Sequence, residues 1–158
     1  MARLLVRTAD LVVGGSGDIL VTEFVGSCVV IMLHDSVAEV GGMAHVLLDC
    51  SRGTEAQSQP GKFADVAVGA LVDAMERRGA LRFRMTASIA GGANMFPAIT
   101  WRALDIGARN VQAVFAQLSA LSIPVVMADV GGSQPRRVVF DISSGMVRVN
   151  TGNATPAR

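Results

Sequence analysis

The sequence Val21-Thr-Glu-Phe-Val-Gly-Ser-Cys28, followed by an apolar run and by Gly41-Gly-Met-Ala-His45, decides how this chain folds. Residues 29–33 are apolar at odd and even positions alike, which is the pattern of a strand that is buried on both faces. Residues 34–39 have the composition of a turn, and residues 40–48 are apolar again. The two apolar runs therefore predict a β-hairpin.

This hairpin brings a thiol close to an imidazole. A turn centred near Val37 places Cys28 opposite residue 46, so His45 lies one step from direct register, within reach of a bulge at the strand end. Cysteine hydrolases use such a pair, with a third group that orients the imidazole. Thr22, on the strand-like run 18–24, is a candidate for that third group. The alternative is that all three residues only pack, since a small thiol suits a core and threonine suits a strand.

The rest of the chain predicts one α+β domain. Apolar residues at helical spacing predict helices over residues 62–78 and from Asp105 to Leu121, the latter with Ile106, Asn110, Val114, Leu118 and Leu121 on one face. Further strands are predicted at 3–7, 10–13, 81–90, 123–130, 137–142 and 146–150, with a glycine turn at 14–17 and a polar loop at 50–61. We expect a mostly antiparallel β layer or sandwich with two helices packed on it. The domain spans 1–158, with its core at about 18–150 and a frayed tail at 151–158.

Composition excludes several classes of function. The chain has 158 residues and a net charge of +1, which argues against binding to nucleic acid or membrane surfaces through bulk charge. Charged residues interrupt the N-terminus too early for a signal peptide, and no apolar run is long enough to span a bilayer. The two cysteines are expected to be reduced thiols in the cytoplasm, and their spacing from the two histidines matches no zinc motif.

Several motifs occur together, in order, along nearly the whole chain. They are Thr22, Gly26-Ser27-Cys28, His45, Lys62-Phe-Ala-Asp65, Gly91-Gly-Ala-Asn-Met-Phe96, Ile106-Gly-Ala-Arg-Asn-Val111 and Asp129-Val-Gly-Gly132. With these motifs the chain resembles the chemoreceptor glutamine deamidase family, CheD, over roughly residues 18–150.

The resemblance implies a function and a site. The expected reaction is hydrolysis of glutamine side-chain amides in chemotaxis receptors, which yields glutamate and ammonia. Cys28 would be the nucleophile, His45 the base and Thr22 the group that orients His45, with Ser27 assisting the Cys28 N–H at the oxyanion. The resemblance also implies a regulatory partner of the CheC phosphatase type. No cofactor, metal or membrane insertion is expected.

Three positions depart from the family pattern. Cys50 stands where relatives often have proline, Ser88 where they often have lysine, and Gln134-Pro135-Arg136 where a Gly-Arg pair is more usual. These changes leave Cys28, His45 and Thr22 in place, but they alter loops on which a surface for a substrate or partner would be built. His34 is interpreted as a solvated turn residue. The alternative functions are a non-enzymatic adaptor that docks a CheC-type phosphatase, or another Cys–His enzyme: a protease, a transglutaminase or a small-molecule amidase.

Overall fold

The computed structural model describes residues 1–51, 53–96 and 105–151, which form two β-sheets and a helical layer. In the five-stranded sheet the order is β2 (Leu11–Gly15), β5 (Val40–Val46), β4 (Val29–Asp35), β6 (Thr86–Gly91) and β7 (Val125–Val130). In the four-stranded sheet it is β1 (Arg3–Leu5), β3 (Ile19–Val25), β8 (Arg136–Asp141) and β9 (Val147–Thr151). The helices are α1 (Glu55–Ser58), α2 (Ala64–Glu76) and α3 (Ile106–Ala120), with 3₁₀ turns η1 (Pro60–Lys62) and η2 (Arg82–Arg84).

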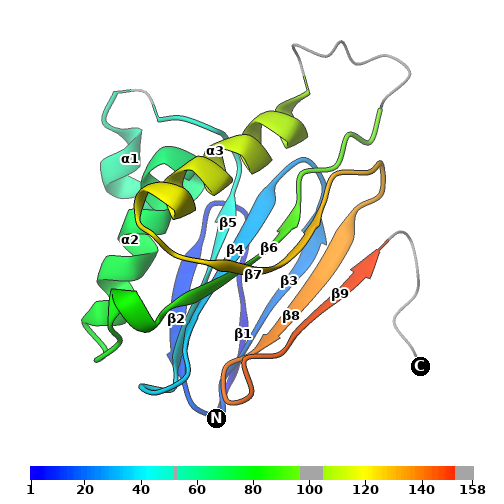
Figure 1. The fold of residues 1–158 in the computed structure, drawn as a ribbon. Coiled ribbons are helices and arrows are strands. Elements are labelled where there is room, and N and C mark those ends of the chain that lie inside the picture. Colours follow the sequence, from blue (N-terminus) through cyan, green and yellow to red (C-terminus); the bar gives the residue numbers. More distant parts are fainter. Residues whose placement is uncertain (52, 97–104, 152–158) are drawn as a thin grey trace.

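The five-stranded sheet is the middle of three layers. Helices α2 and α3 cover one of its faces, and the four-stranded sheet packs against the other (Figure 1). Only the pairs β1–β3 and β6–β7 are parallel among the strand pairs of the described residues. The predicted α+β domain, a mostly antiparallel sandwich carrying two helices, is confirmed. The short helix α1 lies within the polar loop predicted at 50–61, and η1 extends from that loop to Lys62, where a helix is predicted to begin. Most of the tail predicted to fray, 152–158, lies outside the described residues.

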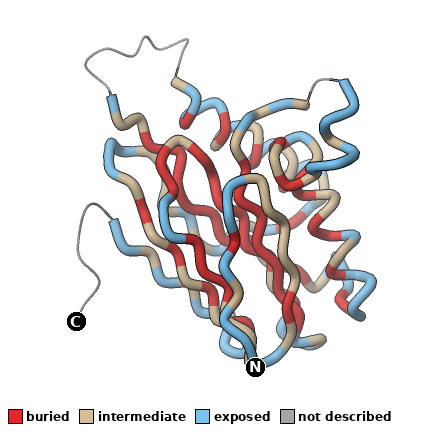
Figure 2. Tube along the Cα trace, turned by 180° about the vertical axis from the view of Figure 1, so that it is seen from behind, coloured by how far each residue is buried: buried red, intermediate tan, exposed pale blue. Residues whose placement is uncertain are grey.

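Strand β4 is buried on both faces, as its sequence predicts. Val29 and Ile31 pack among the helices, whereas Val30 and Met32 pack against the four-stranded sheet, where Phe140 is one of the largest buried side chains. Figure 2 shows that the buried residues concentrate along these central strands. Side chains of β4 and β5 that face the second sheet therefore lie in a core between two sheets.

The register of the β4–β5 hairpin differs from the prediction by one residue. Val29 pairs with Val46 and Val30 with His45, so the position opposite Cys28 is Leu47, not residue 46. Strand β4 ends at Asp35 and β5 begins at Val40, which leaves an even-numbered turn whose centre is half a residue beyond Val37. Because cross-strand neighbours share a face, Cys28 and His45 become diagonal neighbours on one face, and no bulge is needed to bring them together.

The strand predicted over residues 81–90 is wrong in its first half. Residues 82–84 form η2, and the strand begins at Thr86. The fully buried carboxylate of Asp35 accepts hydrogen bonds from the Leu81 N–H (2.9 Å) and from Arg84 Nε (3.0 and 3.1 Å). These bonds hold the segment as a turn, so Arg84 forms an ion pair with Asp35 and does not belong to a polar strand face.

Both predicted long helices form, with small differences at their ends. Helix α2 is followed by Gly79 at φ +96°, the left-handed residue expected after its last turn. Helix α3 begins after Asp105, whose carboxylate accepts a hydrogen bond from the Ala108 N–H at 3.0 Å. The face of α3 predicted from the spacing is buried at Asn110, Val114 and Leu118, whereas Ile106 is 46% exposed.

The first turn of α3 touches the backbone that follows β6. A Cβ added at Gly107 would come within 2.5 Å of the Gly92 carbonyl oxygen and 2.6 Å of that of Ala93. Real Cβ atoms do not approach backbone so closely, so only glycine lets α3 pack here. Gly69 in α2, by contrast, has no atom within 4 Å of the same position.

Two helix glycines should therefore respond in opposite ways to alanine. Gly107→Ala should lower the free energy of unfolding by about 1–3 kcal/mol, because the methyl group overpacks against backbone. Gly69→Ala should raise it by roughly 0.5–1 kcal/mol, because alanine is the better helix former and meets open space. Urea denaturation of both variants checks this. Equal effects would show that the contact of Gly107 with Gly92 and Ala93 is not restrictive.

Candidate active site

Cys28 lies at the corner between β3 and β4, and the backbone after β6 holds it there. The Gly92 N–H donates to the Cys28 carbonyl at 2.7 Å, and the Ala93 N–H donates to the Gly26 carbonyl at 2.9 Å. Gly91 has φ +115°, and a Cβ there would collide with the Cys28 carbonyl oxygen. The Gly91-Gly92 pair is therefore required for the close approach of this segment to the cysteine.

The Cys28 N–H does not donate the hydrogen bond to Gly92 that a regular antiparallel ladder would contain. Gly92 donates to Cys28, but its own carbonyl lies against Gly107 of α3. Among the backbone hydrogen bonds of the described residues there is accordingly no return bond from the Cys28 N–H to Gly92. A backbone donor next to a thiol is what an oxyanion requires.

His45 and Thr22 meet between the two sheets. Each is only 1% exposed, and the Thr22 hydroxyl is hydrogen-bonded to His45 Nδ1 at 2.8 Å. His45 comes from β5 in the middle layer, whereas Thr22 comes from β3 in the second sheet, at the last regular pair before a bulge. The structure therefore brings together Thr22 and His45, with Cys28 diagonal to His45 on the same face of the sheet.

The second ring nitrogen of His45 is available. Within the part of the chain that the structure describes, His45 Nε2 is buried and has no hydrogen-bond partner. If the Nδ1–H donates to the Thr22 hydroxyl, Nε2 carries the lone pair and can accept a proton. The ring is then a base held in one orientation by threonine.

Burial shifts both Cys28 and His45 toward their neutral forms. Desolvation raises the pKa of the Cys28 thiol, and the backbone N–H of Cys28 itself opposes this shift. Desolvation also lowers the pKa of His45, against smaller opposing effects of the Val6 backbone and the Asp10 charge. At neutral pH the resting site therefore holds a thiol and a neutral imidazole, not an ion pair.

Ser27 borders a small hollow between the cysteine corner and the start of α3. The hollow has a volume of about 160 Å³, and its other lining residues include Met95, Phe96 and Gly107. The structure thus places the half-buried Ser27 directly before Cys28, at the edge of this hollow.

Asn110 was not recognised as a site residue from the sequence. Its side chain is fully buried on α3, and its Nδ2 donates to the carbonyls of Ser27 and Leu47, each at 3.0 Å. The available signal was an amide on a helix face that otherwise carries Val114 and Leu118.

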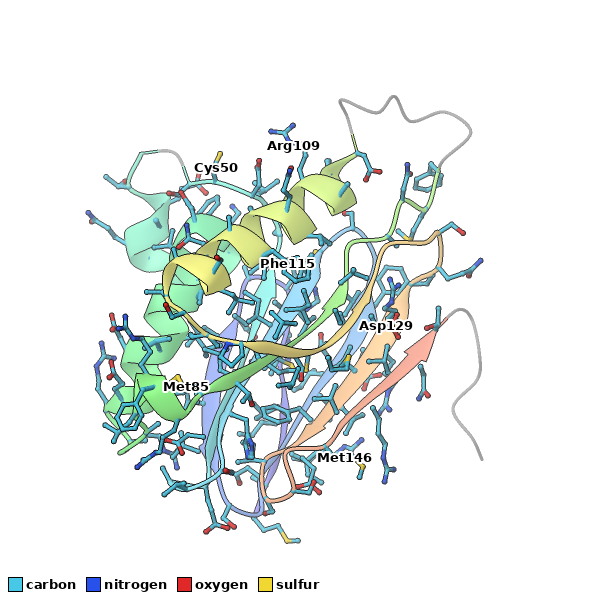
Figure 3. The ribbon with its side chains drawn as sticks, in the orientation of Figure 1. Cys50, Met85, Arg109, Phe115, Asp129 and Met146 are labelled. Carbon is cyan, nitrogen blue, oxygen red and sulfur yellow. The ribbon has the colours of Figure 1, made fainter. Side chains whose placement is uncertain are left out.

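Cys50 lies apart from the Cys28 group. It is an exposed free thiol in a hollow of about 670 Å³, beside the ion pair between Arg109 and Asp49 at 3.2 Å. Figure 3 shows Cys50 and Arg109 on the helical side of the molecule.

The interpretation of His34 as a solvated turn residue is wrong, because it lies in β4 and its Nε2 is hydrogen-bonded to the Ile142 carbonyl at 2.8 Å.

Of the other two departures from the family pattern, Ser88 is an interior position, whereas the segment 134–136 runs from the exposed Gln134 through the half-buried Pro135 to the buried Arg136. Ser88 is buried within β6. Arg136 is also buried, and it donates to the carbonyls of Gly91 (3.3 Å) and Gly131 (2.9 Å) and to the Asp129 carboxylate (3.2 Å). Arg136 therefore braces the glycine segment that holds Cys28, and neither Ser88 nor Arg136 belongs to an exposed docking surface.

Fold and site together define an α+β sandwich with a buried cysteine, histidine and threonine, the side chains of a cysteine hydrolase. The family model described as CheD chemotactic sensory transduction matches residues 47–151. The chain belongs to the CheD family, as its motifs predict.

Two curated relatives match over most of their length. A protein of Clostridium botulinum strain Hall, named probable chemoreceptor glutamine deamidase CheD, is 41% identical over 147 residues, which are 92% of this chain and 91% of the relative. A protein of Desulforamulus reducens with the same name is 38% identical over 151 residues, 95% and 91% of the two chains. The family model begins after His45, but the two relatives match 92% and 95% of this chain. The unmatched part is shorter than the segment from Thr22 to His45, so these matches include residues of that segment.

A solved structure of a Neisseria meningitidis protein, described under DUF152, resembles the fold. Its TM-score is 0.51 at 10% identity, over 84% of this chain and 65% of that protein. None of the helices in the described ranges is long and apolar enough to cross a bilayer.

The low pKa of His45 should make folding stability depend on pH. The pKa of His45 in the folded state lies below the unfolded value of 6.5. Below pH 6.5 the unfolded chain therefore binds more protons than the folded chain, and the free energy of unfolding falls as the pH drops. His45→Gln has no titratable side chain at this position, so its free energy of unfolding should fall less over the same pH range. Urea denaturation at about pH 7.5 and about pH 5.5 measures the difference. Identical pH dependence in both proteins would contradict the burial of a neutral imidazole.

Proposed function

We propose that this protein hydrolyses glutamine side-chain amides of chemoreceptors, releasing ammonia and leaving glutamate. The observation that carries the proposal is the hydrogen bond between His45 Nδ1 and the Thr22 hydroxyl, which leaves Nε2 without a partner among the described residues, on the face that Cys28 shares. Membership of the CheD family and the names of the curated relatives supply the substrate.

The first half of the reaction forms a thioester. His45 Nε2 takes the Cys28 proton as sulfur attacks the amide carbon, and the resulting oxyanion is stabilised by the Cys28 N–H, with Ser27 as an auxiliary group. The imidazolium then gives its proton to the departing nitrogen, and ammonia leaves as the C–N bond breaks.

The second half restores the enzyme. His45 takes a proton from water, the hydroxide attacks the thioester carbon, and the C–S bond breaks as the thiol recovers its proton. The product is the glutamate side-chain acid, which loses its proton to solvent and becomes the carboxylate. Throughout the cycle Thr22 accepts the Nδ1–H bond and holds the ring in a single orientation.

The partners and the compartment follow from the same proposal. Chemoreceptors are the protein substrate, and a CheC-type phosphatase is the regulatory partner that the family resemblance implies. Two free cysteines, one of them exposed, favour a reducing compartment, so we place the protein in the cytoplasm.

The two cysteines provide a matched test of the nucleophile. Cys28→Ala should abolish deamidation of a purified receptor signalling fragment while the fold is kept, whereas Cys50→Ala should keep most of the activity. Intact-mass spectrometry of the receptor and an ammonia assay together measure the reaction. Activity in Cys28→Ala near that of the wild type would contradict the proposal that Cys28 is the nucleophile of this enzyme. Receptor binding without any turnover in the wild type would favour an adaptor, and chain cleavage or cross-linking would favour a protease or a transglutaminase.

The role of the Thr22 hydroxyl can be tested with a substitution that keeps the shape of the side chain. Thr22→Val removes the hydroxyl but keeps the branching, so it should lower turnover by ~10²–10⁴-fold with little loss of stability. Thr22→Ser keeps the hydroxyl and should retain more activity than Thr22→Val. Steady-state kinetics and thermal denaturation of both variants decide the matter. The opposite order, with valine active and serine impaired, would show that the methyl group packs and the hydroxyl has no role.

A further inference from the structure

Asn110 occupies a position that packing alone does not explain. It is fully buried on α3, on the same helix face as Val114 and Leu118, which are also buried. Its Oδ1 is buried and has no hydrogen-bond partner within the described residues. A buried unpaired acceptor costs free energy that an apolar side chain at this position would avoid.

The amide nitrogen of Asn110 bridges the two strands that carry the thiol and the imidazole. Nδ2 donates to the carbonyl of Ser27, the residue directly before Cys28, at 3.0 Å. It also donates to the carbonyl of Leu47, two residues after His45, at 3.0 Å. Only the amino end of the group can donate to both carbonyls, so the two acceptors fix the orientation of the amide.

The bridge stands where the regular ladder has ended. The last pair of the β4–β5 ladder is Val29 with Val46. Beyond it the N–H groups of Leu47 and Leu48 donate to the Lys62 carbonyl at 2.9 and 3.0 Å, so the chain after β5 turns away from β4. Asn110 supplies a link between the strand ends at the point where the backbone no longer does.

We propose that Asn110 is a positioning residue that sets the separation of Cys28 and His45. The inference rests on the proposed Cys28–His45 chemistry and adds a residue that acts on both partners without touching the substrate. A loss of alignment of about 1 Å between reacting groups can lower a rate by about 10²-fold, so a link of this kind is enough to govern turnover.

The first measurement separates positioning from binding. Asn110→Leu keeps the branched shape and removes both donors, and it should lower kcat on a receptor fragment by roughly 10–100-fold with KM nearly unchanged. The control is Val114→Ala, one turn further along α3, which also disturbs a buried contact but bonds neither strand end. Both variants are compared at a temperature where each is folded, and Asn110→Ser replaces the leucine variant if that does not fold. An unchanged kcat, or an equal loss in Val114→Ala, overturns the proposal.

The second measurement needs no substrate. Iodoacetamide labelling of Cys28, followed on its own peptide so that Cys50 does not interfere, reports how well His45 activates the thiol. Asn110→Leu should slow labelling when His45 is present and have no effect when it is combined with His45→Ala. Equal slowing in both backgrounds would mean that Asn110 only shapes access to Cys28, and would refute the proposal. If the wild type failed to deamidate receptors, the proposed function would fall, while this labelling comparison would still decide the role of Asn110.

Discussion

The strand β4 sets the geometry of the molecule, because it is buried against helices on one face and against a second sheet on the other. Its neighbour β5 shares both interfaces, and side chains that alternate along these strands enter one core or the other. His45 faces the second sheet, where backbone groups of β5 are already used in its ladders. A polar partner for the ring must then come from the opposite sheet, and Thr22 on β3 supplies it at 2.8 Å.

The same burial determines how the thiol can react. Desolvation raises the pKa of Cys28 and lowers that of His45, so the resting pair is neutral and a free thiolate is rare. In the proposed reaction, a proton transfer that accompanies attack on a bound amide avoids building an ion pair in the core. Reactivity then depends on the alignment of the two groups more than on their charge, which makes the hydrogen bonds around them important.

Much of the fold could be predicted from hydrophobic periodicity, and the site only in part. The buried strand 29–33 and the helix 64–76 follow from local patterns, but the register was missed because the turn from Asp35 to Val40 has an even number of residues. The turn at 82–84 was missed because Asp35, which holds it, lies far away in the sequence. Cys28 and His45 could be paired by a hairpin, whereas the contact of Thr22 with His45 crosses two sheets and is encoded in no local pattern.

The role of the helical layer shows why a single hairpin is not sufficient for the site. The hairpin brings Cys28 and His45 to neighbouring positions, but its ladder ends just before the thiol. Beyond that point the arrangement depends on α3, where Gly107 packs against the Gly92 carbonyl and Asn110 links the two strand ends. The second sheet fixes the ring of His45 from the other side. The helical layer thus determines the surroundings of the Cys28 corner and the separation of the strand ends, whereas the second sheet holds the orientation of the His45 ring.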